Sequence, residues 1–116
     1  MVTVEQIFSY LEQSLAEATL QADQNEIRQI QQVTSFISGL SPKPVTSSQL
    51  TGELEHQIAR AIEHKQPGVL ADLQVIAGYL MRPAEAHKDR ELARQLRILA
   101  ARARNAIEQI EQARER

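Results

Sequence analysis

The sequence of 116 residues contains no cysteine, no tryptophan, four glycines, and only two tyrosines and two phenylalanines. The absence of cysteine excludes disulfide bonds, a thiolate nucleophile and a cysteine-ligated zinc. The four scattered glycines do not form a glycine-rich phosphate-binding loop. No apolar run approaches the roughly 20 residues that a membrane-spanning helix requires. The first residues, which include Glu5 and Gln6, do not resemble a signal peptide. We therefore expect an intracellular, cytoplasmic protein.

Alanine, leucine, isoleucine, glutamine, glutamate and arginine dominate the composition, and most of these residues are good helix formers. A chain of this length is expected to form one domain, which buries roughly two thirds of the surface that the unfolded chain exposes. The sequence therefore predicts a single all-α domain over residues 1–116, with a core that needs no covalent cross-link.

Two stretches, residues 2–18 and 45–61, read almost alike: VTVEQIFSYLEQSLAEA and VTSSQLTGELEHQIARA. Each begins with a capping box, in which a threonine oxygen accepts a bond from the amide three residues later and a glutamine reaches back to the cap amide. Each also places two apolar residues where a hydrophobic staple would pack. The capping boxes are Thr3 with Gln6 and Thr46 with Gln49, and the staple pairs are Val2 with Ile7 and Val45 with Leu50.

From these two starts, apolar residues recur every three or four positions and predict four helices. Short turns pair them antiparallel, so residues 1–42 and 43–82 each form a helical hairpin, in a four-helix-bundle-like or HEAT-like arrangement. Pro42 and Pro44 separate the hairpins, and Pro83 is predicted to end the second. Because capping and periodicity explain most of the shared residues, duplication of an ancestral hairpin stays an open alternative.

Residues 83–116 predict a long amphipathic helix without glycine. Thirty-odd helical residues extend roughly 45–50 Å at 1.5 Å per residue, so we expect this helix to project partly beyond the hairpins. Its apolar residues alternate at steps of four and three, as in the seam of a coiled coil. The part of this apolar seam expected to meet a second copy of the chain or another protein is Leu96, Leu99, Ala103, Ala106 and Ile110.

The charge is distributed unevenly, although the net charge is only −2. Residues 1–40 hold one basic and five acidic residues, whereas residues 81–116 hold nine basic and six acidic ones. On the last helix, four arginines at steps of four, three and seven fall within about 80° of arc. We call Arg90, Arg94, Arg97 and Arg104 the Arg ridge. Such a row of guanidiniums suits an acidic protein face or phosphates, and the alternative is a solvated face with local ion pairs.

The three histidines carry weaker signals. Glu53 and His56 form a Glu-x-x-His motif, but di-iron bundles use two copies of this motif, and the chain has one. His64 invites comparison with histidine phosphotransfer bundles, but a proline three residues later places it at a helix end, where the helix dipole favours a cation. His87 is expected in the first turn of the last helix.

We therefore expect a non-enzymatic protein–protein interaction module, such as an adaptor, a small chaperone or a regulatory subunit. It would act through helical surfaces, especially that of the last helix, with no cofactor, metal or membrane partner. The first alternative is a nucleic-acid-associated protein that uses the Arg ridge, although the negative net charge and the few aromatic residues weaken it. The second alternative is a phosphotransfer-type bundle centred on His64.

Overall fold

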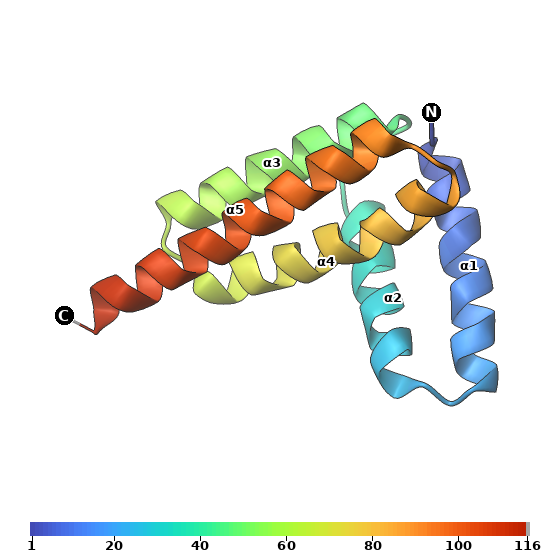
Figure 1. Cartoon of the computed structure of the whole chain (residues 1–116), viewed down its shortest axis with the longest axis horizontal. Coiled ribbons are helices and arrows are strands. Elements are labelled where there is room, and N and C mark those ends of the chain that lie inside the picture. Colours follow the sequence, from blue (N-terminus) through green and yellow to red (C-terminus); the bar gives the residue numbers. More distant parts are fainter. Residues whose placement is uncertain (116) are drawn as a thin grey trace.

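The computed structural model describes residues 1–115, whose regular elements are five α-helices (Figure 1). The prediction of an all-α fold is confirmed. None of the helices in this part of the chain is long and apolar enough to cross a bilayer. The helices are α1 (Val4–Leu20), α2 (Gln24–Ser38), α3 (Ser47–Glu63), α4 (Pro67–Ala86) and α5 (Arg90–Arg114).

Helix α4 is the central element, because it packs against each of the other four helices. Figure 1 shows α3, α4 and α5 side by side, with α3 and α5 running in the same direction and α4 running opposite to both. The α1–α2 hairpin runs across this group near the C-terminal part of α4. Helix α4 packs more extensively against α5 than against α3, so the last helix is an integral part of the fold.

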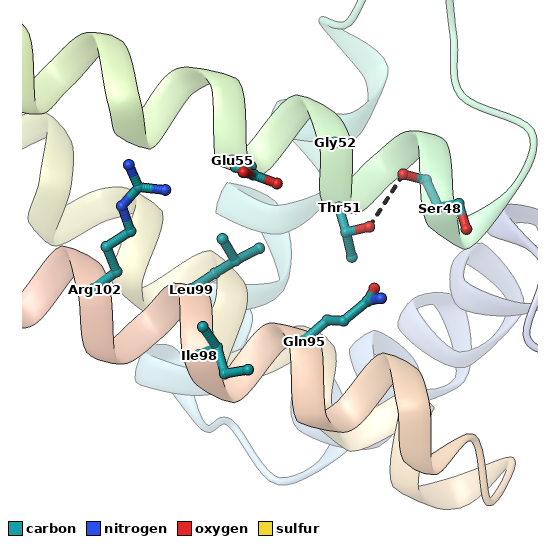
Figure 2. Close-up of a pocket in the computed structure, with 8 residues that line it drawn as sticks. All are labelled: Ser48, Thr51, Gly52, Glu55, Gln95, Ile98, Leu99 and Arg102. Carbon is teal, nitrogen blue, oxygen red and sulfur yellow. Dashed lines mark hydrogen bonds between the residues drawn. The ribbon is translucent and has the colours of Figure 1, made fainter.

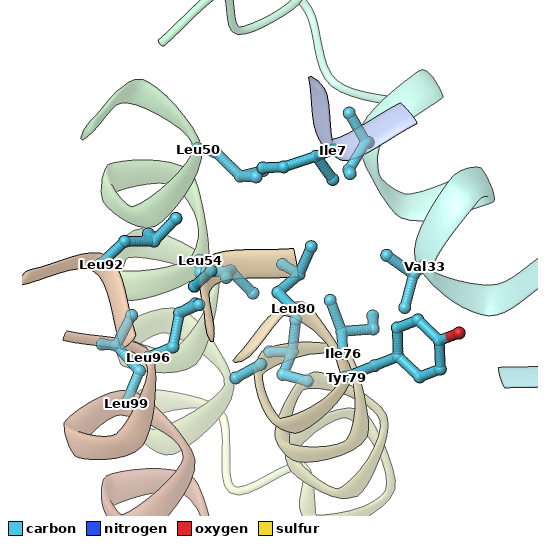
Figure 3. Packing of buried hydrophobic residues seen from close by; sticks show 14 of the residues in the cluster. Ile7, Val33, Leu50, Leu54, Ile76, Tyr79, Leu80, Leu92, Leu96 and Leu99 are labelled. Carbon is cyan, nitrogen blue, oxygen red and sulfur yellow. The ribbon is translucent and has the colours of Figure 1, made fainter. Parts of the chain in front are cut away.

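The hydrophobic core draws on every helix, as Figure 3 shows for a part of it. Leucines from α3, α4 and α5 meet between these three helices, and the side chains of α1 and α2 reach the same cluster from the hairpin. The best-buried members, all at 0–1% exposure, include Ile7, Val33, Leu54, Leu80 and Leu96. These residues belong to the apolar stripes predicted from the sequence.

A polar cluster also joins the hairpin to α4. The Tyr79 hydroxyl donates to Glu26 Oε1 at 2.8 Å, and Arg82 Nη1 donates to the same oxygen at 2.7 Å. The Arg82 guanidinium lies 4.6 Å from the centroid of the Tyr79 ring, within cation–π distance. Burial and the hydrogen bond to Glu26 raise the pKa of Tyr79 to about 12. The apolar spacing of this helix did not predict that Tyr79 would be buried, and its hydroxyl can be buried because Glu26 of α2 accepts its hydrogen bond.

The two repeated helix starts lie next to each other. Both capping boxes form, with Gln6 N donating to Thr3 Oγ1 at 3.2 Å and Gln49 N donating to Thr46 Oγ1 at 3.1 Å. Thr3 and Thr46 also form an antiparallel bridge, in which the backbone amide of Val4 donates to the carbonyl of the residue before Thr46 at 3.2 Å. The capping residues therefore fix where α1 and α3 begin, and the backbone between them holds the two starts together.

The start of α5 is tied to the same region. One carboxylate oxygen of Asp89 caps α5 by accepting from Leu92 N at 3.1 Å, and the other accepts from Val2 N at 2.9 Å. These two hydrogen bonds, the one from Val2 foremost, lower the pKa of Asp89 below its usual value of 3.8. A single side chain thus connects residues 87 positions apart.

Three of the helix connections use the same turn. After α1, α3 and α4, one residue adopts a left-handed conformation: Ala22 (φ 54°), Lys65 (φ 52°) and Lys88 (φ 57°). The amide of the next residue then bonds to a carbonyl five positions back, the pattern of a Schellman motif. The three carbonyls belong to buried alanines, namely Ala18, Ala61 and Ala84. Glycine usually occupies the left-handed position, so the residue types at these turns did not indicate the motif.

The prediction that Pro83 ends the fourth helix is wrong. Helix α4 continues to Ala86, and Pro83 lies inside it with its side chain buried. The proline removes one hydrogen-bond donor near the end of the helix, but its carbonyl still accepts from the amide of His87 at 3.1 Å. Helix α5 therefore begins at Arg90, and its 25 residues extend roughly 37 Å, less than predicted. Its C-terminal end extends past α3 and α4 (Figure 1).

The second hydrophobic staple is also absent. Val2 and Ile7 are both buried at the first start, but Val45 is 71% exposed and does not cover Leu50. The backbone of Val45 explains this difference, because its carbonyl accepts from Val4 and its amide donates to Gln49 Oε1 at 2.8 Å. These bonds hold the backbone at the bridge and leave the side chain in solvent.

The left-handed turns generate a stability prediction. Lys65→Gly and Lys88→Gly should each raise the free energy of unfolding by about 1 kcal/mol, because a β-carbon is unfavourable at positive φ. Lys43→Gly is the matched control, since it removes an exposed lysine whose φ is not positive. Chemical denaturation should show stabilisation at the two turns and none for the control. Destabilisation at both turns would contradict this account of the strain.

The Asp89 tie predicts a specific dependence on acid. Because the pKa of Asp89 is lower in the folded than in the unfolded chain, its stabilisation is complete above pH 3.8 and is lost as the pH falls through the folded value. Asp89→Ala should lower the free energy of unfolding at neutral pH by about 1 kcal/mol, the usual effect of losing a cap. Denaturation series should show a weaker pH dependence below pH 3.8 in Asp89→Asn than in the wild type. An unchanged dependence would contradict the prediction.

Candidate interaction surfaces

The structure places all four residues of the Arg ridge on the exposed side of α5. All except Arg104 line one hollow of about 680 Å³ at the corner between α4 and α5. Lys88 adds a fourth cation to this basic hollow, and buried alanines from both helices line it as well. Glu85 and Asp89 are its acidic members, so the lining residues carry four positive and two negative charges.

Only part of this positive charge is neutralised within the chain. Arg94 pairs with Glu91 at 2.6 Å on the surface, a local ion pair of the kind expected for a solvated face. Donation from Arg94 lowers the pKa of Glu91 and raises the pKa of Arg94 itself. Within residues 1–115, no ion pair involves Arg90, Arg97 or Lys88. Most of the cations in the hollow are therefore available to a ligand.

The apolar seam lies mainly inside the protein. Leu96, Leu99, Ala103 and Ala106 have exposures of 0–7% and pack against the core formed by this chain alone. Ile110 is half-buried at the edge of the same cluster. Of the residues predicted to meet a second chain, only Ile110 is therefore left near the surface.

A second concave surface lies between α3 and α5, and Figure 2 shows its lining. This α3–α5 groove has a volume of about 350 Å³, and it continues along α5 into a further hollow that shares Ile98 and Arg102 with it. From α3 it is lined by Ser48, Thr51, Gly52 and Glu55, and from α5 by Gln95, Ile98, Leu99 and Arg102.

The groove combines an apolar side chain, a bare stretch of backbone and two opposite charges. Ile98 is 52% exposed, unlike the leucines that precede and follow it on the inner face of α5. A β-carbon added at Gly52 would meet no atom within 4 Å, so the α3 wall is open at this point. Glu55 and Arg102 are both exposed, and within residues 1–115 neither takes part in an ion pair.

All three histidines are exposed. His56 and His64 line a hollow on α3 together with Glu53 and Arg60, but the residues that the structure describes contain no group of three metal-ligating side chains. His64 caps the C-terminus of α3, so its predicted position at a helix end is confirmed. The prediction for His87 is wrong, because this residue caps the C-terminus of α4 and α5 begins three residues later.

Comparisons of the chain with protein-family models, with curated proteins and with solved structures found no significant match. The candidate surfaces are therefore identified from the geometry of this chain alone. Helical spacing predicted the Arg ridge, but it did not predict the α3–α5 groove, which needs two helices separated by a third in the sequence. The signal available for the groove was Gly52, a glycine in a helix interior, where it costs roughly 0.5–1 kcal/mol relative to alanine.

The open wall of the groove predicts a gain in stability on substitution. Gly52→Ala should raise the free energy of unfolding by about 0.5–1 kcal/mol, because the new methyl group meets no neighbour. Gly78→Ala in α4 is the matched control, since a β-carbon there also meets nothing within 4 Å. Thermal and chemical denaturation should show similar gains for both variants. A loss confined to Gly52→Ala would mean that the wall is not open.

Proposed function

We propose that the protein is a non-enzymatic helical interaction module that binds an acidic segment of another protein through the Arg ridge. An adaptor, a small chaperone or a regulatory subunit would each use such a surface. One observation carries the proposal: four cations surround one hollow, and only Arg94 among them is in an ion pair within residues 1–115.

The chemistry of arginine favours a carboxylate-bearing partner. Its planar guanidinium can donate two parallel hydrogen bonds to one carboxylate, and it is more weakly hydrated than an ammonium group. Three arginines on successive turns would meet acidic side chains spaced at three or four residues on a partner helix. The small alanine side chains between the cations would leave room for the partner backbone to approach.

Nucleic acid is the second candidate, and two features disfavour it. The chain has a net charge of −2, and residues 1–40 alone carry −4, so phosphate backbones would be repelled from much of the molecule. No aromatic side chain on which a base could stack lines the basic hollow. A single-stranded nucleic acid would therefore lack the base-stacking contacts that usually accompany the binding of its phosphates.

The proposal is tested by binding of a labelled glutamate-rich helical peptide, with its glutamine counterpart as the control ligand. The wild type should bind the acidic peptide in a salt-dependent manner. Combined replacement of Arg90, Arg94 and Arg97 by glutamine should weaken binding at least about tenfold, a loss of about 1.4 kcal/mol. Fluorescence anisotropy measures this change.

The matched control removes the same charge elsewhere, by replacing the exposed residues Arg28, Lys43 and Arg60 with glutamine. This control should bind the acidic peptide nearly as well as the wild type. Equal losses in both triple variants would reduce the effect to net charge and overturn the proposal. Tighter binding of an RNA or DNA oligonucleotide, lost in the Arg ridge variant, would assign the ridge to nucleic acid instead.

A further inference from the structure

We infer that the α3–α5 groove is the interface of a two-fold symmetric homodimer. The inference concerns a different face of α5 from the Arg ridge, and it does not depend on the acidic partner proposed above. It rests on the side chains that line the groove, on the parallel course of the two helices and on the two charges left unpaired across it.

The first step is that α3 and α5 run in the same direction, with their N-terminal parts at the same end of the groove (Figures 1 and 2). A two-fold axis along the groove, parallel to both helices, would place α3 of one copy over α5 of the other. Each residue would keep its position along that axis. Residues that face each other across the groove in one copy would then meet between the two copies. Such an interface is isologous, so each contact occurs twice.

The second step is the complementarity of the groove to itself. Ile98 is a half-exposed apolar side chain on α5, and Gly52 leaves open space in the α3 wall of the same groove. In the two-fold arrangement, Ile98 of each copy enters the space over Gly52 of the other. Removal of two such side chains from water favours association, and glycine allows the helices to approach closely.

The third step is the electrostatic match. Glu55 and Arg102 line the same groove from opposite helices, and neither has an ionic partner within residues 1–115. In Figure 2 the Arg102 guanidinium reaches from α5 toward α3. The same symmetry places Glu55 of each copy over Arg102 of the other, which gives two ion pairs. A groove with one charge of each sign suits a second copy better than a strongly charged partner.

The charges provide a test that only an intermolecular pair can pass. Light scattering and sedimentation should show a dimer of the wild type at high protein concentration. Glu55→Arg and Arg102→Glu should each raise the dissociation constant at least about tenfold, because like charges then meet twice. Mixing the two variants in equal amounts should restore the dimer. In the mixed dimer both positions are basic in one copy and acidic in the other, so each contact again joins opposite charges.

Two further variants test the apolar contact. Gly52→Leu should prevent association by filling the space that Ile98 occupies, whereas Gly78→Leu, at another open helical glycine, should leave the dimer intact. Ile98→Ser should weaken the dimer, and Val75→Ser, at an exposed apolar residue of α4, is its control. Circular dichroism checks that each variant stays folded.

The outcomes separate the alternatives. A wild type that stays monomeric at every concentration overturns the inference, as does a dimer that survives both charge reversals. A failure of the mixed variants to associate shows that the two charges do not meet between copies, and it also overturns the inference. None of these variants alters the Arg ridge, so acidic-peptide binding by each can be measured independently.

Discussion

Helix α4 contacts all four other helices, and its apolar residues therefore determine where each of them lies. Because α5 packs along α4 with its leucines and alanines, its polar residues are left at the surface, and they contribute to both candidate surfaces. Three arginines of the Arg ridge lie where α5 borders the C-terminal end of α4, and the α3–α5 groove lies where α5 borders α3. The position of the polar residues of α5 is therefore a consequence of which side of this helix is buried in the core.

The features that were predicted correctly from the sequence are those that depend on a few neighbouring residues. A capping box lies within four residues, so both helix starts could be located from Thr3 and Thr46. The Arg ridge lies on a single helix, so the helical repeat alone placed its members on one side. The apolar stripes likewise identified most of the core, because amphipathic periodicity follows the side that each helix buries.

The features that were missed depend on residues far apart in the chain. Tyr79 can be buried because Glu26, 53 residues earlier, accepts its hydrogen bond. Pro83 remains helical where tertiary packing buries it, against its local tendency to end a helix. The α3–α5 groove needs α4 to bring two parallel helices together, which no helical repeat encodes. The left-handed turns were missed for another reason: lysine and alanine occupy positions where glycine is the usual signal.

The repeated turn also bears on how the chain folds. Three of the four connections join consecutive helices through a few residues, so most helix pairs can form from segments that are close in sequence. Such local pairing closes small loops and is typical of rapidly folding helical proteins. The bond from Val2 to Asp89 is different, because it closes a loop of 87 residues and can form only after the start of α1 has reached the turn between α4 and α5. The two ends of this loop would therefore be joined late, and the amide of Val2, which donates to Asp89, would be among the first to exchange with solvent when the native state opens.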